Sequence, residues 1–158
     1  MSAAAFHNGV KAALLGDAVF SAAIAALLGR PVTAAHGANV PLASLPADRL
    51  PCFVIEQGDG DAASISVDGG DEGLVIGLAQ QQFASELHVT LVWSEQDRET
   101  AGMQRRSLPG LLAQLMLRMP QPGGIHFARL AGWEPDRGVN HPLQVWRATL
   151  RGEYVISQ

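Results

Sequence analysis

Leu87-His88-Val89-Thr90-Leu91-Val92-Trp93-Ser94 is the stretch that decides the fold class. Side chains of a strand point alternately to its two faces. Leu87, Val89, Leu91 and Trp93 therefore share one face, while His88, Thr90, Val92 and Ser94 share the other. The alternation predicts a β-strand whose first face lies in the hydrophobic core.

A helix is predicted to follow this strand within residues 100–119, after the polar turn Glu95–Glu99. Its apolar residues recur at spacings of three, four and seven, which is the period of one helix face. They are Leu108, Leu111, Leu112, Leu115, Met116 and Met119. Pro109 leaves two alternatives: it lies in the first turn, with Ser107 near the cap, or it kinks a longer helix that begins near Thr100.

Another helical stretch is predicted from Phe6 to Leu28, where apolar residues again recur at spacings of three and four. Gly16-Asp17 lies in its middle, which leaves open one continuous helix or two. Gly29-Arg30-Pro31 ends the stretch, as glycine followed by proline does. Residues 32–49 are interpreted as a long connecting loop.

Further strands are predicted before the central one. Cys52–Ile55 is a β run that ends in the turn sequence Gln57–Gly60. Ser64–Val67 alternates polar and apolar residues and closes on the turn Asp68–Asp71. Leu74–Leu78 is interpreted as a short third strand.

Two strands are predicted after the second helix. Ile125–Trp133 is the first, with Ile125, Phe127 and Ala131 as core positions and a turn at Asp136–Gly138. Leu143–Ile156 is the last and longest. Its residues are assigned to two faces. One face is predicted to carry Trp146, Ala148, Leu150, Tyr154 and Ile156, and the other Gln144, Arg147, Thr149, Arg151 and Glu153.

Together these segments predict an α+β fold, with a mainly antiparallel sheet of four to six strands and two helices packed on one face. Strands that follow one another directly favour antiparallel pairing. The chain has 158 residues, which is the size of one domain. We therefore expect a single domain over residues 1–158.

The amino-acid composition argues against nucleic acid and membranes as partners of this chain. Hydrophobic residues make up 47% of the chain and charged residues 16%, below the roughly 25% that is usual. The net charge is −4 and Lys11 is the one lysine, so the basic stripe of a nucleic-acid-binding protein is absent. Apolar runs are shorter than the roughly 20 residues of a membrane span. The amino terminus does not resemble a secretory signal, so synthesis in the cytoplasm is expected.

Residues that carry chemistry are scattered along the sequence. Cys52 is the one cysteine, and its apolar neighbours are typical of a small buried side chain. The five histidines show no close metal-binding spacing. Asp59 and Asp61 resemble the start of a calcium loop, but Ser64 stands where such a loop needs glycine. We predict no catalytic, cofactor or metal site, and do not expect an enzyme.

Four segments carry a family resemblance: the helix end 25–32, the proline-marked strand 50–55, the strand 87–94 and the final strand 145–150. Their order resembles the tail terminator, or tail-completion, proteins of long-tailed bacteriophages and gene transfer agents. The resemblance implies a structural virion protein that closes the tail tube as a ring, commonly a hexamer.

The resemblance also implies partners and a location. The partners would be further copies of the chain, the tail tube protein and the head-side connector or neck protein, without a cofactor. The protein would lie in the host cytoplasm during assembly and then at the head-proximal end of the virion tail.

A ring repeats one head-to-tail interface until it closes. Such interfaces are enriched in aromatic residues and arginine. The candidate interface residues are Arg98, Arg105, Arg106, Arg118, Trp133, Pro135 and Arg137.

Two alternatives stay open. Another neck or head–tail joining protein would have a similar size and construction. A small-molecule-binding domain, or an enzyme with an unrecognised site, would instead contain an apolar pocket with a few converging polar groups.

Overall fold

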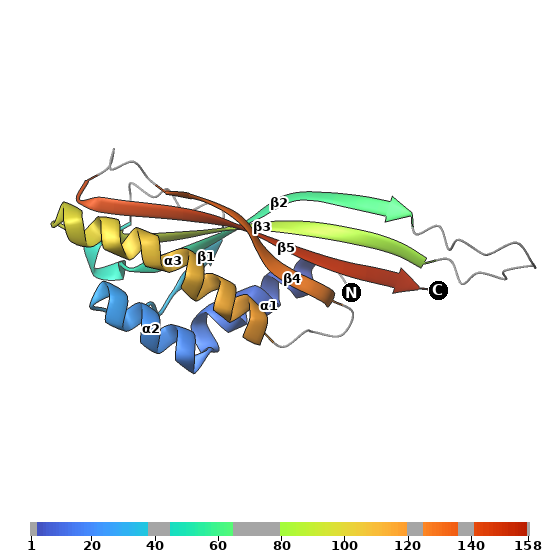
Figure 1. Cartoon of the computed structure of the whole chain (residues 1–158), viewed down its shortest axis with the longest axis horizontal. Coiled ribbons are helices and arrows are strands. Elements are labelled where there is room, and N and C mark those ends of the chain that lie inside the picture. Colours follow the sequence, from blue (N-terminus) through green and yellow to red (C-terminus); the bar gives the residue numbers. More distant parts are fainter. Residues whose placement is uncertain (1–2, 38–44, 65–79, 120–124, 136–140, 158) are drawn as a thin grey trace, which may run out of the picture.

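The computed structural model describes residues 3–37, 45–64, 80–119, 125–135 and 141–157. These residues form an α+β fold with one five-stranded sheet in the order β1-β2-β3-β5-β4 (Figure 1). The strands are β1 Ala35–Gly37, β2 Cys52–Ser64, β3 Gln80–Ser94, β4 Ile125–Pro135 and β5 Leu143–Ser157. β1 runs parallel to β2, and the other neighbouring strands are antiparallel. The predicted fold class is therefore confirmed.

β3 is the central strand, and its burial follows the predicted alternation. Leu87, Val89, Leu91 and Trp93 are each at most 1% exposed, and they belong to the main core. Val92, on the opposite face, is also buried, because Leu50 and Cys52 pack over it in a smaller apolar cluster. The core therefore lies mainly, but not solely, on the helix-covered side of the sheet.

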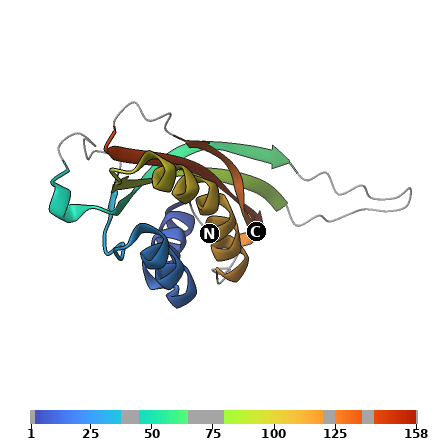
Figure 2. The same ribbon diagram turned by 60° about the vertical axis from the view of Figure 1, so that its left-hand side comes forward.

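The helices cover one face of this sheet, and Figure 2 shows them on the same side. They are α1 Ala3–Gly16, α2 Ala18–Leu28 and α3 Arg98–Arg118. The amino-terminal stretch is thus two helices. Asp17 separates them and caps α2, since its carboxylate accepts a hydrogen bond of 2.7 Å from the Phe20 backbone N–H. Gly29 ends α2 in the left-handed conformation, with φ at 73°.

α3 resolves the alternatives for Pro109 in favour of the longer helix. Asp97 caps its first turn by accepting a hydrogen bond of 3.0 Å from the Glu99 backbone N–H, so Pro109 lies inside the helix. The apolar face behaves as predicted: Leu108, Leu112 and Leu115 are each at most 2% exposed.

A buried polar network joins β3, α3 and the end of α2. The Trp93 indole N–H donates to the Gln104 side-chain oxygen at 2.7 Å, which links β3 to α3. The Gln104 amide in turn donates to the Leu27 carbonyl at 3.1 Å and to the Glu95 carboxylate at 3.3 Å. Gln104 thus orients α3 against both the sheet and the end of α2.

The predicted turn at Gln57–Gly60 is wrong, because β2 continues through it to Ser64. The pairing of β2 with β3 shifts register between Gln57 and Gly60, so the glycines belong to a bulge. At Gly58, an added Cβ would lie 2.9 Å from His88 Nε2 and 3.1 Å from Glu86 Cβ. The glycine is needed for close approach of the two strands, and not for reversal of the chain.

Three other expectations need correction. The loop predicted for residues 32–49 contains the short strand β1 and a 3₁₀ turn, Ala47–Arg49. Ala131 is exposed, because β4 shifts register between Leu130 and Gly132 and the alternation breaks there. Gln144 is 1% exposed, since it lies two residues before Trp146 and shares its face.

Several expectations fall outside the described residues. They are the strand at residues 65–67, the turn at 68–71, the strand at 74–78 and the turn at 136–138.

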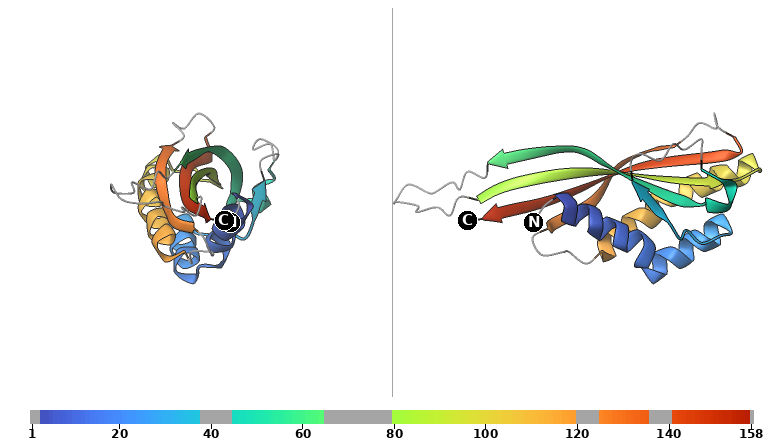
Figure 3. Two further views of the ribbon diagram at one scale, coloured as in Figure 1. Left: turned by 90° about the vertical axis from the view of Figure 1, so that its right-hand side faces the viewer. Right: turned by 180° about the vertical axis from the view of Figure 1, so that it is seen from behind.

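The ends of β2 and β3 beyond the bulge extend past the helices, together with the end of β5 (Figures 1 and 3). We call the paired residues 59–64 of β2 and 80–85 of β3 the arm. Phe83 on the arm stacks on Tyr154 of β5, with ring centroids 5.6 Å apart. The arm is therefore held to the sheet by strand pairing and by this aromatic contact.

Gly152 of β5 allows α1 to approach the sheet, and this gives a test of the packing. A Cβ at Gly152 would lie 2.9 Å from the fully buried ring of Phe6. We expect Gly152→Ala to lower the free energy of unfolding by about 1–3 kcal/mol, measured by urea denaturation. Gly132→Ala is the matched control, since a Cβ there meets no atom within 4 Å. Equal losses in the two variants would contradict the proposed contact.

Candidate functional site

A groove lies between α3 and the sheet and brings together three of the predicted interface residues. Its volume is about 380 Å³. It is lined by Gly102, Arg105, Arg106, Pro109, Trp133 and Trp146. Trp146 is 2% exposed, whereas Trp133 is 53% exposed. The groove thus combines a buried indole, an exposed indole and two guanidinium groups; we call it the Arg–Trp groove.

Arg105 is held in place from inside the fold. It donates a hydrogen bond of 2.6 Å to the Gln144 side-chain oxygen. The Gln144 amide donates to the backbone carbonyls of Glu95 and Pro142, each at 3.4 Å. Arg105 therefore contributes positive charge to the groove from a fixed position, while Arg106 is exposed on the surface of α3.

Of the other predicted interface residues, Arg98 and Pro135 lie in described elements. Arg98 is exposed at the start of α3, one turn before Gly102. Pro135 pairs in register with Trp146, so it lies at the same end of the sheet as the groove. Arg137 lies outside the described residues.

Sequence reasoning did not identify the rest of the groove. Gly102, Arg106 and Pro109 lie on one face of α3 at spacings of four and three, which is a signal that could have grouped them. Trp146 was predicted in the core but not as part of a surface hollow. Its place in the hollow depends on how α3 packs against the sheet.

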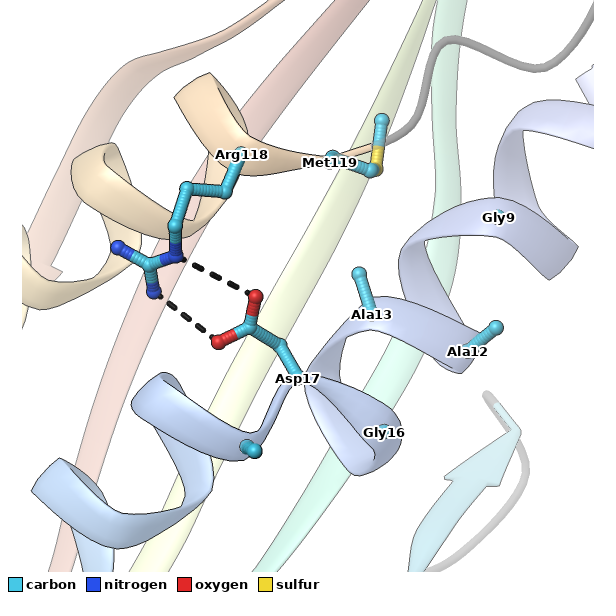
Figure 4. Close-up of a pocket in the computed structure, with 8 residues that line it drawn as sticks. Gly9, Ala12, Ala13, Gly16, Asp17, Arg118 and Met119 are labelled. Atoms are coloured by element: carbon cyan, nitrogen blue, oxygen red, sulfur yellow. Dashed lines mark hydrogen bonds and ion pairs between the residues drawn. The ribbon is translucent and has the colours of Figure 1, made fainter.

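Arg118 lies at the other end of α3 and is paired within the chain. Its Nε and Nη2 donate to the two Asp17 carboxylate oxygens at 3.3 Å and 3.1 Å (Figure 4). This contact ties the end of α3 to the junction of α1 and α2. Arg118 hydrogen bonding, aided by the Phe20 backbone N–H, holds the pKa of Asp17 below its ordinary value.

The Asp17–Arg118 pair borders a second hollow of about 620 Å³. Small side chains of α1, including Gly9, Ala12 and Ala13, form much of its lining. It is apolar apart from the ion pair, whose two groups already satisfy each other. Among the described residues that line it, this hollow therefore offers no uncommitted polar side chain to orient a small ligand.

Two of the residues considered for chemistry, Cys52 and His88, lie on the neighbouring strands β2 and β3. Cys52 is fully buried beside Leu50 and Val92, and burial raises the pKa of its thiol. This agrees with its interpretation as a small buried side chain. His88 Nδ1 lies 3.2 Å from Thr149 Oγ1, a contact between neighbouring strands. Within the described ranges, no three His, Cys, Asp or Glu residues lie close enough together to hold a metal ion.

None of the described helices is, by itself, long and apolar enough to cross a membrane. Ala4–Gly16 and Ala18–Leu28 would meet the criterion of length and composition only when taken together, and they are bent by 61° at their junction.

No protein-family model matches the sequence, and no curated protein matches it. The fold is similar to that of a chain in a solved structure described as "Virion of native gene transfer agent (GTA) particle". The TM-score is 0.53 at 15% sequence identity. The similarity covers 99% of this chain and 100% of the other. At this identity the comparison establishes a shared fold over the whole of both chains.

The Asp17–Arg118 pair makes a measurable prediction about ionisation. We expect the pKa of Asp17, followed by NMR titration, to rise toward its ordinary value in Arg118→Gln. Because the folded-state pKa is lowered, the stabilisation is present at neutral pH and is lost as the pH falls through that lowered value. Arg106→Gln makes the same change at an arginine that does not contact Asp17. An unchanged Asp17 pKa in Arg118→Gln would disprove the assignment.

Proposed function

We propose that this protein is a structural subunit of a phage or gene transfer agent virion. The observation that carries the proposal is the fold shared, end to end, with a chain from a gene transfer agent particle. The two chains cover each other almost completely, so the similarity extends to the helices as well as the sheet. A structural role needs surfaces for assembly and no reactive centre.

Within that class, we propose that the chain acts as a tail terminator that closes the tail tube as a ring. The order of its segments, from the amino-terminal helices to the long final strand, supports this role. Its partners would be further copies of itself, the tail tube protein and the head-side connector. It would assemble in the host cytoplasm and remain at the head-proximal end of the tail.

The two edges of the sheet are suited to head-to-tail assembly of copies. Among the described residues, no strand pairs with the outer edge of β4, and β1 covers β2 only at Phe53–Ile55. Unpaired strand edges are sites where another chain can add by backbone hydrogen bonding. The two edges belong to different strands, so a contact between them is head-to-tail and can be repeated until a ring closes.

A small-molecule-binding role is less well supported. The larger hollow is lined by small apolar side chains, and its charged groups, Asp17 and Arg118, are paired with each other. Another neck protein would share the assembly behaviour but bind the head-side connector and not the tail tube, so the choice of partner separates that alternative.

Two measurements test the proposal: the mass of the assembled protein and its binding to tail tubes. We expect purified protein to form rings in light scattering and negative-stain images, either alone or on the ends of purified tail tubes. Binding to tube ends identifies a terminator, because a neck protein that meets only the head-side connector would not bind them. A protein that stays monomeric at high concentration and has no affinity for tube ends would refute the proposed function.

A further inference from the structure

Charge is divided very unevenly along the chain. Residues 50–97 contain nine acidic residues and neither lysine nor arginine. Residues 98–158 contain eight arginines and four acidic residues. These segments therefore carry −9 and +4, and residues 1–49 contribute the +1 that brings the net charge to −4. The modest net charge conceals an acidic segment and a basic segment of the same fold.

Some of these opposite charges form ion pairs within the sheet. Glu86 accepts from Arg151 at 3.2 Å, and Glu56 lies 3.6 Å from Arg147. These pairs lie where β2, β3 and β5 run side by side. Beyond them, Asp59 is exposed and Asp61 follows on the same strand. The arm therefore continues the acidic segment past the arginines of β5 that could neutralise it.

The Arg–Trp groove is basic and aromatic, so its charge is complementary to that of the acidic arm. Arg106 and Trp133 are exposed, and Arg105 is fixed beside them by Gln144. Arginine and tryptophan are the residues most enriched among those that dominate binding energy at interfaces. Guanidinium groups bind carboxylates with directed hydrogen bonds, so an acidic segment is the partner that this groove fits.

The arm and the groove cannot meet within one molecule. The arm projects from one end of the long axis, whereas the start of α3, which carries the groove, lies toward the other end (Figures 1 and 3). β3 and β5 run continuously between them. A contact that matches the two charges must therefore join two copies.

We propose that the acidic arm of one copy docks in the Arg–Trp groove of the next copy. In this contact Asp59, with Asp61 two residues further along the strand, brings negative charge to Arg105 and Arg106, and Trp133 packs against the docked strand. This interface rests on the proposed function in requiring that copies assemble, but it assigns the contact to particular residues. The two surfaces differ, so the contact is head-to-tail and agrees with the open edges of β2 and β4.

Charge reversal on each side tests the contact. The arm variant is Asp59→Arg with Asp61→Arg, and the groove variant is Arg106→Asp, which spares the buried bond of Arg105. Sedimentation velocity at low and high salt measures self-association, with tail tubes added if wild type needs them. Each variant alone should weaken association by about tenfold or more, as expected for loss of close interfacial charge pairs. The combined variant, in which both charges are reversed, should recover most of the loss.

Lys11→Asp is the matched control, because Lys11 is an exposed cation of α1 that belongs neither to the groove nor to the open edges of β2 and β4. We expect it to assemble like wild type, and circular dichroism checks that all variants are folded. Wild-type assembly that neither the arm nor the groove variant changes would refute the docking but leave the ring function standing. Equal weakening by Lys11→Asp, or absence of recovery in the combined variant, would also refute it.

Two further outcomes count against the docking. Variants that self-associate normally but no longer bind tail tubes would show that the groove receives the tube protein. Wild type that assembles neither alone nor on tubes would remove the proposed function, and the docking with it.

Discussion

The contact between Trp93 and Gln104 constrains the whole arrangement of helices on the sheet. Trp93 stands on the buried face of the central strand, and its N–H would lack an acceptor without α3. Gln104 supplies that acceptor and simultaneously satisfies the Leu27 carbonyl at the end of α2. An unpaired polar group in a core costs about 1–3 kcal/mol, so the three elements are bound to one relative position. The groove beside α3 has its shape because of this constraint.

The strongest sequence patterns predicted the parts of the fold that local chemistry controls. The alternation around Leu91 and the helical spacing around Leu112 both describe a face buried against one continuous core, and both were confirmed. Pro109 could not be placed from spacing alone, because the helix starts after its cap Asp97, which lies twelve residues before Pro109 and within the predicted polar turn Glu95–Glu99. Where the pattern was regular, the sequence was sufficient.

The wrong sequence predictions share a physical cause. In each case the pairing with a neighbouring strand, and not the local sequence, determines the conformation. Gly58 and Gly60 have the composition of a turn, yet here they relieve crowding against β3. Ala131 fits the alternation of Ile125 and Phe127 along the sequence, but a register shift in β4 leaves it on the exposed side. The groove was only partly predictable for the same reason. Arginine and tryptophan could be chosen by type, whereas the buried Trp146 that completes the hollow depends on how α3 crosses the sheet.

Gly58 marks a division between two kinds of constraint on this chain. On one side of it, Phe53 and Ile55 of β2 are buried in the core that the helices close. On the other side, β2 runs on past the helices (Figure 1). A change of charge at the exposed Asp59 is therefore expected to cost little folding stability, whereas changes at the buried Phe53 and Ile55 are not. Gly58 thus separates a part of β2 that is constrained by the core from a part whose surface charge is free to change.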